Sequence, residues 1–279
     1  MAVDLPALAS DEIDRRNTEF WDELCGTGLA QQLGLVGRDR ETLDAFDRAY
    51  LAFYPYLSGY LDRFSLTGRR VLEIGLGYGT LGQQIIQRGA EYHGLDIAAG
   101  PVRMMQHRLA MLEKPGEDRI VQGTALSMPF ADETFDFVYS IGCLHHTGDL
   151  ARSIDEVRRV LVPDGHAVVM LYHEGSARQL LRVRLPAAAA RLRGRAGPSH
   201  DDVARMYDAN SKGTVAPHTD FVSRRTVRSL FSRFASVRIE TRNFDDIRVR
   251  RRLVLSRSRA LGSPLERWMG LDLYIVARR

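Results

Sequence analysis

The chain has 279 residues and a net charge of +4, with 44% hydrophobic and 27% charged residues. These fractions are typical of globular proteins, so the composition excludes a disordered or fibrous chain. The two cysteines, Cys25 and Cys143, are too few for a disulfide framework, and neither a basic leader nor a long apolar run indicates export or a membrane span. We therefore expect a cytoplasmic protein made of one domain with additions.

The first 64 residues predict helices at 11–24 and 41–64. In the second range apolar residues recur every three or four positions, which is the period of an amphipathic helix (Leu43, Phe46, Tyr50, Phe53, Tyr54 and Leu57). Pro55 is expected to kink or divide this helix. We interpret residues 1–64 as an N-terminal helical cap.

From residue 65 onward, short apolar strands alternate with helices. Strands are predicted at 70–74, 91–95, 119–122, 135–140, 166–172, 237–242 and 271–277, with a turn at 162–165 before the fifth. Helices are predicted at 80–88, 101–112, 151–161 and 223–234. This alternation predicts a doubly wound α/β domain over 65–279, with a mainly parallel seven-stranded sheet. The ranges 175–222 and 244–265 break the rhythm and are interpreted as helical insertions.

The first strand runs directly into a turn with glycine at every second position, Gly75, Gly77 and Gly79. Glycines there permit positive φ and expose backbone N–H groups to a ligand at the edge of the sheet. Together with a fourth glycine at position 82, the turn matches the dinucleotide fingerprint. Glu73, however, would repel a phosphate and suits a ligand that carries positive charge.

Asp96 ends the second strand, where a carboxylate can accept hydrogen bonds from both hydroxyls of a ribose. The alternative is that this side chain caps the helix that follows.

Further motifs follow at regular intervals: LSMPFADETFDFV from residue 126, LHH from residue 144 and RVLVPDG from residue 159. With the glycine turn and Asp96, they make 70–173 resemble the class I S-adenosylmethionine-dependent methyltransferases, in particular the type 11 branch of small-molecule enzymes. The resemblance implies a Rossmann-like fold, S-adenosyl-L-methionine as cofactor and S-adenosyl-L-homocysteine as product.

The resemblance also implies roles for single residues. Glu73 and the three glycines would surround the methionine part of the cofactor, and Asp96 would hold its ribose. Ile97 would pack on the adenine, and the edge of the adenine would be lined by Thr124, Ala125 and Leu126. Ser140 and Ile141 would close the site below. Thr124 stands where the family commonly has aspartate, so its contact with the adenine would be weaker.

Three histidines are candidates for a catalytic base. His145 and His146 follow the fourth strand and His173 follows the fifth, all at the edge where ligands bind; the alternative is that they are structural. Tyr54, on the helical face of Tyr50, is a candidate for cation–π contact with the sulfonium, or else a core residue. We assign no metal ligands.

These residues favour methyl transfer to a small-molecule acceptor, at oxygen or nitrogen more than carbon, in bacterial specialised metabolism. Arginine runs at 178–195 and 248–259 keep a lipid or nucleic-acid acceptor as an alternative, although a nucleic-acid partner is disfavoured because no aromatic residues are interleaved with them. A binding protein that does not methylate is also compatible with the motifs, and a nicotinamide oxidoreductase is the least favoured function. The sequence carries no signal for the oligomeric state.

Overall fold

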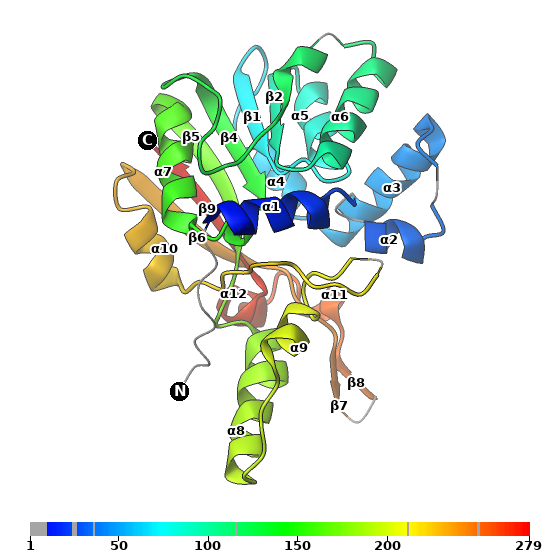
Figure 1. Cartoon of the computed structure of the whole chain (residues 1–279), viewed down its shortest axis with the longest axis vertical. Helices are drawn as coiled ribbons and strands as arrows, with labels where there is room; N and C mark the ends of the chain where they lie inside the picture. Colours follow the sequence, from blue (N-terminus) through cyan, green and yellow to red (C-terminus); the bar gives the residue numbers. More distant parts are fainter. Residues whose placement is uncertain (1–9, 24–26, 36, 115, 211, 250–251) are drawn as a thin grey trace.

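The computed structural model describes residues 10–23, 27–35, 37–114, 116–210, 212–249 and 252–279, so Cys25 and the end of the predicted helix 11–24 lie outside it. Its centre is a seven-stranded sheet of order β3-β2-β1-β4-β5-β9-β6, parallel except for β9, which is antiparallel to β5 and β6 (Figure 1). The strands are β1 Arg70–Ile74, β2 Glu91–Asp96, β3 Ile120–Gln122, β4 Phe135–Ile141, β5 Leu161–Tyr172, β6 Ser236–Arg242 and β9 Asp272–Arg278. This confirms the predicted doubly wound α/β fold.

Helices cover both faces of the sheet because successive residues of its strands point to opposite sides. In β5, Ala167 and Val169 pack on the side of α7 and α10, whereas Val168 and Met170 pack on the side of α4, α5 and α6. The covering helices are α4 Leu57–Leu61, α5 Thr80–Gln87, α6 Ala99–Met111, α7 Leu150–Val160 and α10 Arg224–Leu230.

The helices before β1 are α1 Ser10–Trp21, α2 Thr27–Gln32, α3 Arg40–Phe53 and α4. The predicted helix 41–64 is divided into α3 and α4 next to Pro55, as expected, because proline cannot continue a helix. Phe53 departs from the predicted apolar stripe, since its side chain is 43% exposed. The guanidinium of Arg257 lies 3.9 Å from the centre of the Phe53 ring, so this ring makes a cation–π contact instead of packing in the core.

The turn predicted at 162–165 is not separate from the fifth strand. β5 begins at Leu161, which pairs with Phe135, and pairing resumes between His166 and Phe137, so the intervening residues form an irregularity within the strand. Asp164 in this segment has φ of 62°, which an aspartate tolerates better than most residues.

The two insertions differ from each other. The first contains helices, as predicted: the π-helix η3 Gln179–Arg184, α8 Leu185–Leu192 and α9 His200–Ala204. The prediction of a helical second insertion is wrong for its first part, which is the antiparallel hairpin of β7 Ile247–Val249 and β8 Arg252–Leu255, followed by α11 Arg257–Ala260 and α12 Pro264–Met269. Arginine alternates there with valine, leucine and isoleucine, and this alternation favours strands.

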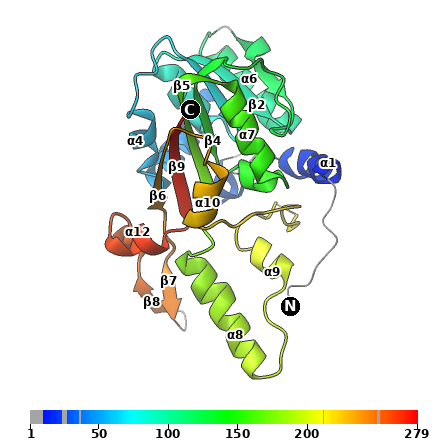
Figure 2. The same ribbon diagram turned by 90° about the vertical axis from the view of Figure 1, so that its left-hand side faces the viewer.

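Figures 1 and 2 show that α8 and the hairpin both extend from the same end of the molecule, away from the sheet. The remaining elements are the short 3₁₀ turns η1 Glu117–Arg119 and η2 Leu144–His146. None of the helices in the described ranges combines the length and the apolar character that crossing a membrane requires.

Candidate active site

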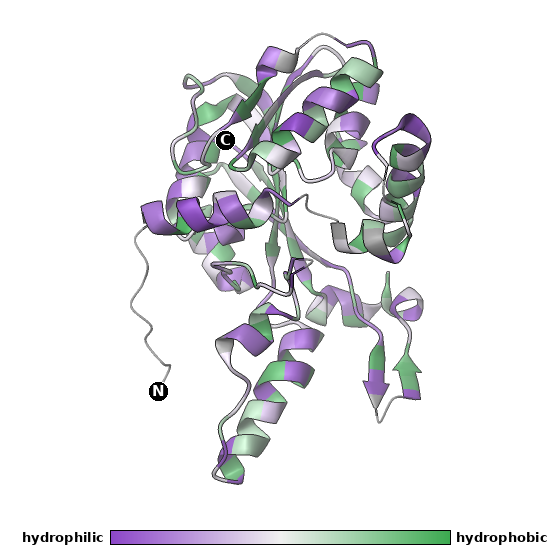
Figure 3. Ribbon diagram, turned by 45° about the vertical axis from the view of Figure 1, so that its right-hand side comes forward, coloured by the Kyte–Doolittle hydropathy of each residue, from purple (hydrophilic) through white to green (hydrophobic). Residues whose placement is uncertain are grey.

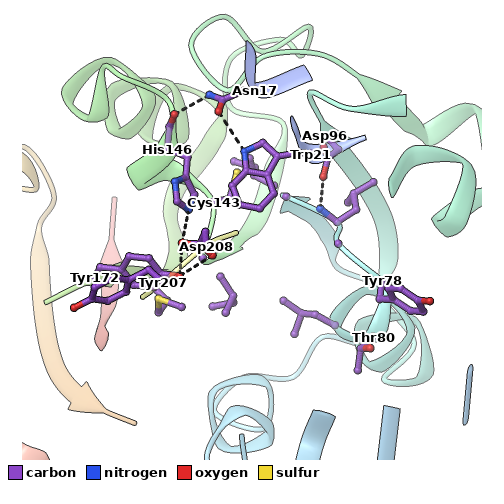
Figure 4. Close-up of a pocket in the computed structure, with 18 of the residues that line it drawn as sticks. Asn17, Trp21, Tyr78, Thr80, Asp96, Cys143, His146, Tyr172, Tyr207 and Asp208 are labelled. Atoms are coloured by element: carbon purple, nitrogen blue, oxygen red, sulfur yellow. Dashed lines mark hydrogen bonds and ion pairs between the residues drawn. The ribbon is translucent and has the colours of Figure 1, made fainter. Parts of the chain in front are cut away.

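A cavity of about 640 Å³ lies at the carboxyl ends of β1, β2 and β4. The strand order reverses between β1 and β4, and the crevice at such a reversal is where open α/β sheets bind ligands. The cavity extends from the glycine turn to the base of the first insertion, and α1 and α3 contribute part of its wall (Figure 4).

The glycine turn brings bare backbone to the cavity wall. Gly75 has φ of 84°, and a β-carbon there would lie 2.5 Å from Cβ of Cys143, so no side chain fits. Gly77 has φ of 51° and lines the cavity with Gly75. Gly79 is set back from the wall, where it caps α5 in the left-handed conformation. The turn is therefore the ligand platform that the sequence predicted, built from two of the three glycines.

Glu73 is a buried carboxylate at the end of this platform. Its side chain accepts a hydrogen bond from the hydroxyl of Tyr92. Burial raises the pKa of Glu73 to about 8, although the tyrosine opposes the shift. A positively charged ligand would restore the ionised form, which is the electrostatic role that the sequence predicted for this residue.

Asp96 joins the platform to the second strand. One carboxylate oxygen accepts from the N–H of Leu76 at 2.8 Å, and the other accepts from the N–H of Ala98 at 2.9 Å. Burial raises the pKa of Asp96 to about 6, against the effect of these backbone hydrogen bonds. Asp96 therefore does bond at the start of α6, as the capping alternative expected, but it also lines the cavity.

Most of the remaining predicted contacts reach the same cavity, which is lined by Tyr54, Ile97, Thr124, Ala125 and Ile141. Two predicted residues do not. The hydroxyl of Ser140 donates to the carbonyl of Ile74 at 3.1 Å, and Leu126 is buried away from the wall. Both side chains are therefore buried in the protein and do not line the cavity.

Of the three candidate histidines, only His146 lines the cavity. His145 is fully buried, with its ring 4.0 Å from that of Tyr172. His173 is bonded through Nδ1 to the carbonyl of Gly270 at 3.0 Å. Neighbouring residues at the end of a strand point to opposite sides, so Tyr172 faces the cavity and His173 faces away. His145 and His173 therefore do not line the cavity, the first because it is fully buried and the second because its side chain faces away.

His146 is held as a neutral base. Its Nδ1 lies 2.7 Å from the carbonyl oxygen of His218, and because a carbonyl only accepts, Nδ1 carries the proton. Nε2 then has a free lone pair and lies 3.6 Å from a carboxylate oxygen of Asp208. The hydroxyl of Tyr172 donates to Asp208 at 3.0 Å. Burial lowers the pKa of His146 below its usual range, although Asp208 opposes this shift.

Sequence reasoning missed three residues around His146. Asp208 comes from the first insertion, and Asn17 and Trp21 come from α1 (Figure 4). The side-chain amide of Asn17 donates to the carbonyl of His146 at 2.8 Å, and Nε1 of Trp21 donates to Asn17 at 3.3 Å. The contacts of His146 with these residues join distant parts of the sequence, so no local pattern could have indicated them.

The cavity is also lined by an ion pair. Arg178 donates to both carboxylate oxygens of Asp245, at 2.7 and 2.8 Å, and its guanidinium lies 4.6 Å from the ring centre of Tyr207. This pair connects the start of the first insertion to the segment before the hairpin.

Comparison with known proteins identifies the domain. Residues 72–169 match the family model described as a methyltransferase domain. The chain carries a class I S-adenosylmethionine-dependent methyltransferase domain. Domains of this type use S-adenosyl-L-methionine as cofactor, so the resemblance seen in the sequence is confirmed.

Two curated relatives match more than half of the chain. A phthiotriol/phenolphthiotriol dimycocerosates methyltransferase of Mycobacterium ulcerans is 31% identical over 58% of this chain and 62% of its own length. A bifunctional biotin biosynthesis protein of Cellvibrio japonicus is 31% identical over 55% of this chain and 29% of its own length. The chain thus spans less than two thirds of the length of these relatives.

Solved structures share the fold. A SAM-dependent methyltransferase from Methanosarcina mazei aligns with a TM-score of 0.51 at 16% identity, covering 79% of this chain and 96% of its own. An S-adenosylmethionine-dependent methyltransferase from Mesorhizobium loti aligns with a TM-score of 0.50 at 20% identity, covering 82% of this chain and 98% of its own.

The residues of the methyltransferase domain fit the cofactor. The cavity has the volume of a small-molecule site, the backbone at Gly75 admits no β-carbon, and the raised pKa of the buried Glu73 shows that its carboxylate lacks charge compensation. Two buried acids beside a bare turn suit a ligand with positive charge and ribose hydroxyls better than a pyrophosphate.

Proposed function

We propose that the chain transfers the methyl group of S-adenosyl-L-methionine to an oxygen or nitrogen atom of a small-molecule acceptor, in bacterial specialised metabolism. The observation that carries this proposal is that the glycine turn, with Glu73 and Asp96, opens into the same cavity as His146 and Asp208. One end suits the cofactor, and the other offers a base to an acceptor.

Within the proposal, the cofactor contacts are those that the cavity wall provides. Glu73, Gly75 and Gly77 would hold the methionine part and Asp96 the ribose, while Ile97, Thr124, Ala125 and Ile141 would line the adenine. The described part of residues 1–64 acts as a cap, because α1 and α3 place aromatic residues over the cavity (Phe20, Trp21, Phe46, Tyr50 and Tyr54).

The cofactor supplies an activated methyl group, so the chain itself has to align the acceptor, exclude water and remove a proton where the acceptor carries one. His146 would take that proton at Nε2. The Nδ1–H bond to the carbonyl of His218 fixes the tautomer, and the carboxylate of Asp208 stabilises the imidazolium that forms. Trp21, whose ring lies 4.9 Å from that of His146, shields the base from solvent.

Titration calorimetry with S-adenosyl-L-methionine, S-adenosyl-L-homocysteine and NADH tests the cofactor assignment. We expect binding of both adenosyl compounds and none of NADH at pH 8 and above, where an ionised Glu73 repels phosphate. Tight binding of NADH without binding of the adenosyl compounds would contradict the proposal.

Asp96→Ala is expected to weaken the binding of S-adenosyl-L-methionine by about tenfold or more, because a charge-assisted pair of hydrogen bonds to the ribose is lost. The matched control is Asp155→Ala, which removes an exposed carboxylate paired with Arg233 on the surface. Calorimetry measures both affinities, and far-ultraviolet circular dichroism checks the fold. Normal binding by Asp96→Ala would show that the ribose does not reach this strand end.

Cofactor binding is expected to strengthen as the pH rises from about 6.5 to 8. The pKa of Glu73 is about 8 without ligand, so below that pH a cationic ligand must displace a proton. The affinity should then fall by up to about tenfold per pH unit of acidification, with proton release measurable by calorimetry in buffers of different ionisation enthalpy.

Glu73→Gln supplies the control for this pH dependence, because the amide does not titrate. The melting temperature of the unliganded protein should change with pH in the opposite direction to cofactor affinity. The raised pKa of Glu73 contributes stability that is fully present below the unfolded value of 4.5. This stability is lost as the pH rises through about 8. If cofactor affinity depends on pH equally in the wild type and in Glu73→Gln, the proposed electrostatic role of Glu73 is contradicted.

A further inference from the structure

Helix α8 is largely exposed. None of its residues is buried, although it carries a stripe of apolar side chains that continues from η3. Leu181, Leu185 and Leu192 are 41%, 53% and 89% exposed, and with Ala188 they follow a spacing of three and four residues. A soluble helix normally buries such a stripe, so α8 presents an apolar face without a partner among the described residues.

Arginines flank this stripe. No acidic residue occurs between Glu174 and Asp201, and the segment forms no ion pair within the described residues except at Arg178 (Arg182, Arg184, Arg191, Arg193 and Arg195 are its remaining arginines). The combination of an apolar stripe with cations at its sides is typical of helices that lie in the headgroup region of a membrane.

The hairpin of β7 and β8 repeats this chemistry. Leu253 and Val254 are 49% and 63% exposed, and no acidic residue lies between Asp246 and Glu266. Figure 3 shows hydrophobic and hydrophilic residues mixed along both α8 and the hairpin, which extend from the same end of the molecule. We refer to 179–195 and the described part of 247–255 as the two arms.

Both arms begin at the acceptor end of the cavity. Arg178 directly precedes the first arm and Asp245 lies just before the second, and their ion pair ties the two together. Both residues also line the cavity, as do Tyr207 and Asp208. A surface that contacts the arms therefore lies next to residues that line the same cavity as His146.

We propose that the two arms dock the protein on an anionic lipid bilayer, from which it takes an amphiphilic acceptor. The second half of this statement rests on the proposed function, whereas the first does not. The arms' arginines complement anionic headgroups and the exposed leucines enter the boundary with the acyl chains. A nucleic acid would match the arginines but leave the leucines in water, and a second copy of the chain would bring arginine against arginine.

Vesicle co-sedimentation tests docking. The full chain is mixed with vesicles of phosphatidylcholine alone or of equal parts phosphatidylcholine and phosphatidylglycerol. We expect binding to the anionic vesicles that is about tenfold or more tighter than to the neutral ones and that weakens as salt is raised. Leu185→Glu with Leu192→Glu should abolish it. Leu33→Glu changes an exposed leucine outside the arms and should not.

A second pair of variants distinguishes the effect of the arginines in the arms on vesicle binding from the effect of the net charge of the protein. Arg191→Gln with Arg193→Gln should weaken binding to anionic vesicles several-fold. Arg225→Gln with Arg228→Gln removes the same charge from the exposed face of α10 and should leave binding unchanged. Equal loss in the two double variants would show a nonspecific charge effect and overturn the proposal.

Two further outcomes would also contradict docking. One is a dimer in sedimentation velocity that the Leu185→Glu, Leu192→Glu variant disrupts. The other is duplex DNA that binds the arms and displaces the protein from the vesicles. Calorimetry with S-adenosyl-L-methionine on each variant keeps the two proposals distinguishable. If the wild-type chain binds the cofactor but not the vesicles, only membrane docking is contradicted. If it binds the vesicles but not the cofactor, the proposed methyl transfer is contradicted, and so is the uptake of an acceptor from the membrane.

Discussion

Replacing His146 by glutamine is expected to lower methyl transfer by about 100-fold or more while leaving the affinity for S-adenosyl-L-methionine unchanged. Glutamine keeps a polar side chain of similar reach but cannot take a proton at Nε2. The measurement is S-adenosyl-L-homocysteine formation with a panel of phenols and amines, together with cofactor calorimetry. Loss of turnover at constant cofactor affinity distinguishes a base from a residue that shapes the cofactor site.

The pH profile separates a catalytic role of His146 from a structural one. Burial lowers the pKa of His146, so the wild-type base is neutral at neutral pH and is lost only as the pH falls below the usual range of histidine. The wild type should show this acidic limb, and the residual activity of His146→Gln should lack it. His107→Gln, an exposed histidine of α6, is the control and should retain both rate and profile. Turnover by His146→Gln at the wild-type rate would exclude His146 as the base.

Replacing Arg108 by methionine is expected to lower the free energy of unfolding by about 3–5 kcal/mol, because a buried carboxylate would lose its partner. The Arg108 side chain is fully buried and donates to both carboxylate oxygens of Asp47, at 2.8 and 2.9 Å. It also donates to the carbonyl of Tyr78 at 2.7 Å, so it supports the glycine turn from below. Urea denaturation measures the loss, and cofactor affinity should fall with it.

The control for Arg108→Met is Arg103→Met on the same helix, whose side chain is 61% exposed and which should cost less than about 0.5 kcal/mol. The double variant Asp47→Leu, Arg108→Met removes both charges and should recover much of the stability, since no buried charge is then left unpaired. A double variant no more stable than Arg108→Met would show that the loss comes from packing and not from the unpaired charge.

The arrangement of the sheet could be predicted from the sequence because its signals are local. Strand-like runs of four to seven residues that alternate with helices are compatible with few arrangements besides mainly parallel strands covered on both faces. The second insertion differs from its prediction for a related reason. A run of arginines is typical of a helix surface, whereas the strands Ile247–Val249 and Arg252–Leu255 pair as a hairpin.

The residues at the proposed cofactor end of the cavity could be predicted from the sequence, because they lie within one strand–turn–helix unit and the next strand. Gly75, Glu73 and Asp96 occupy fixed places in that unit, so their proximity follows once the strands are parallel. Ser140 does not reach the cavity because the side to which a residue points at the end of a strand depends on the local twist, which the pattern does not specify. Leu126 lies in the turn between β3 and β4, where no strand alternation indicates the direction of a side chain.

The acceptor end was decided only by the tertiary structure. The sequence offered His145, His146 and His173 alike, and burial together with the alternation of side chains selected His146. Its partners lie in α1 and in the first insertion, and the ion pair of Arg108 with Asp47 joins α6 to α3. Contacts between segments so far apart depend on how helices and loops pack on the finished sheet. The sequence by itself therefore determined the fold and the identity of the cofactor, and the tertiary structure decided which side chains line the cavity.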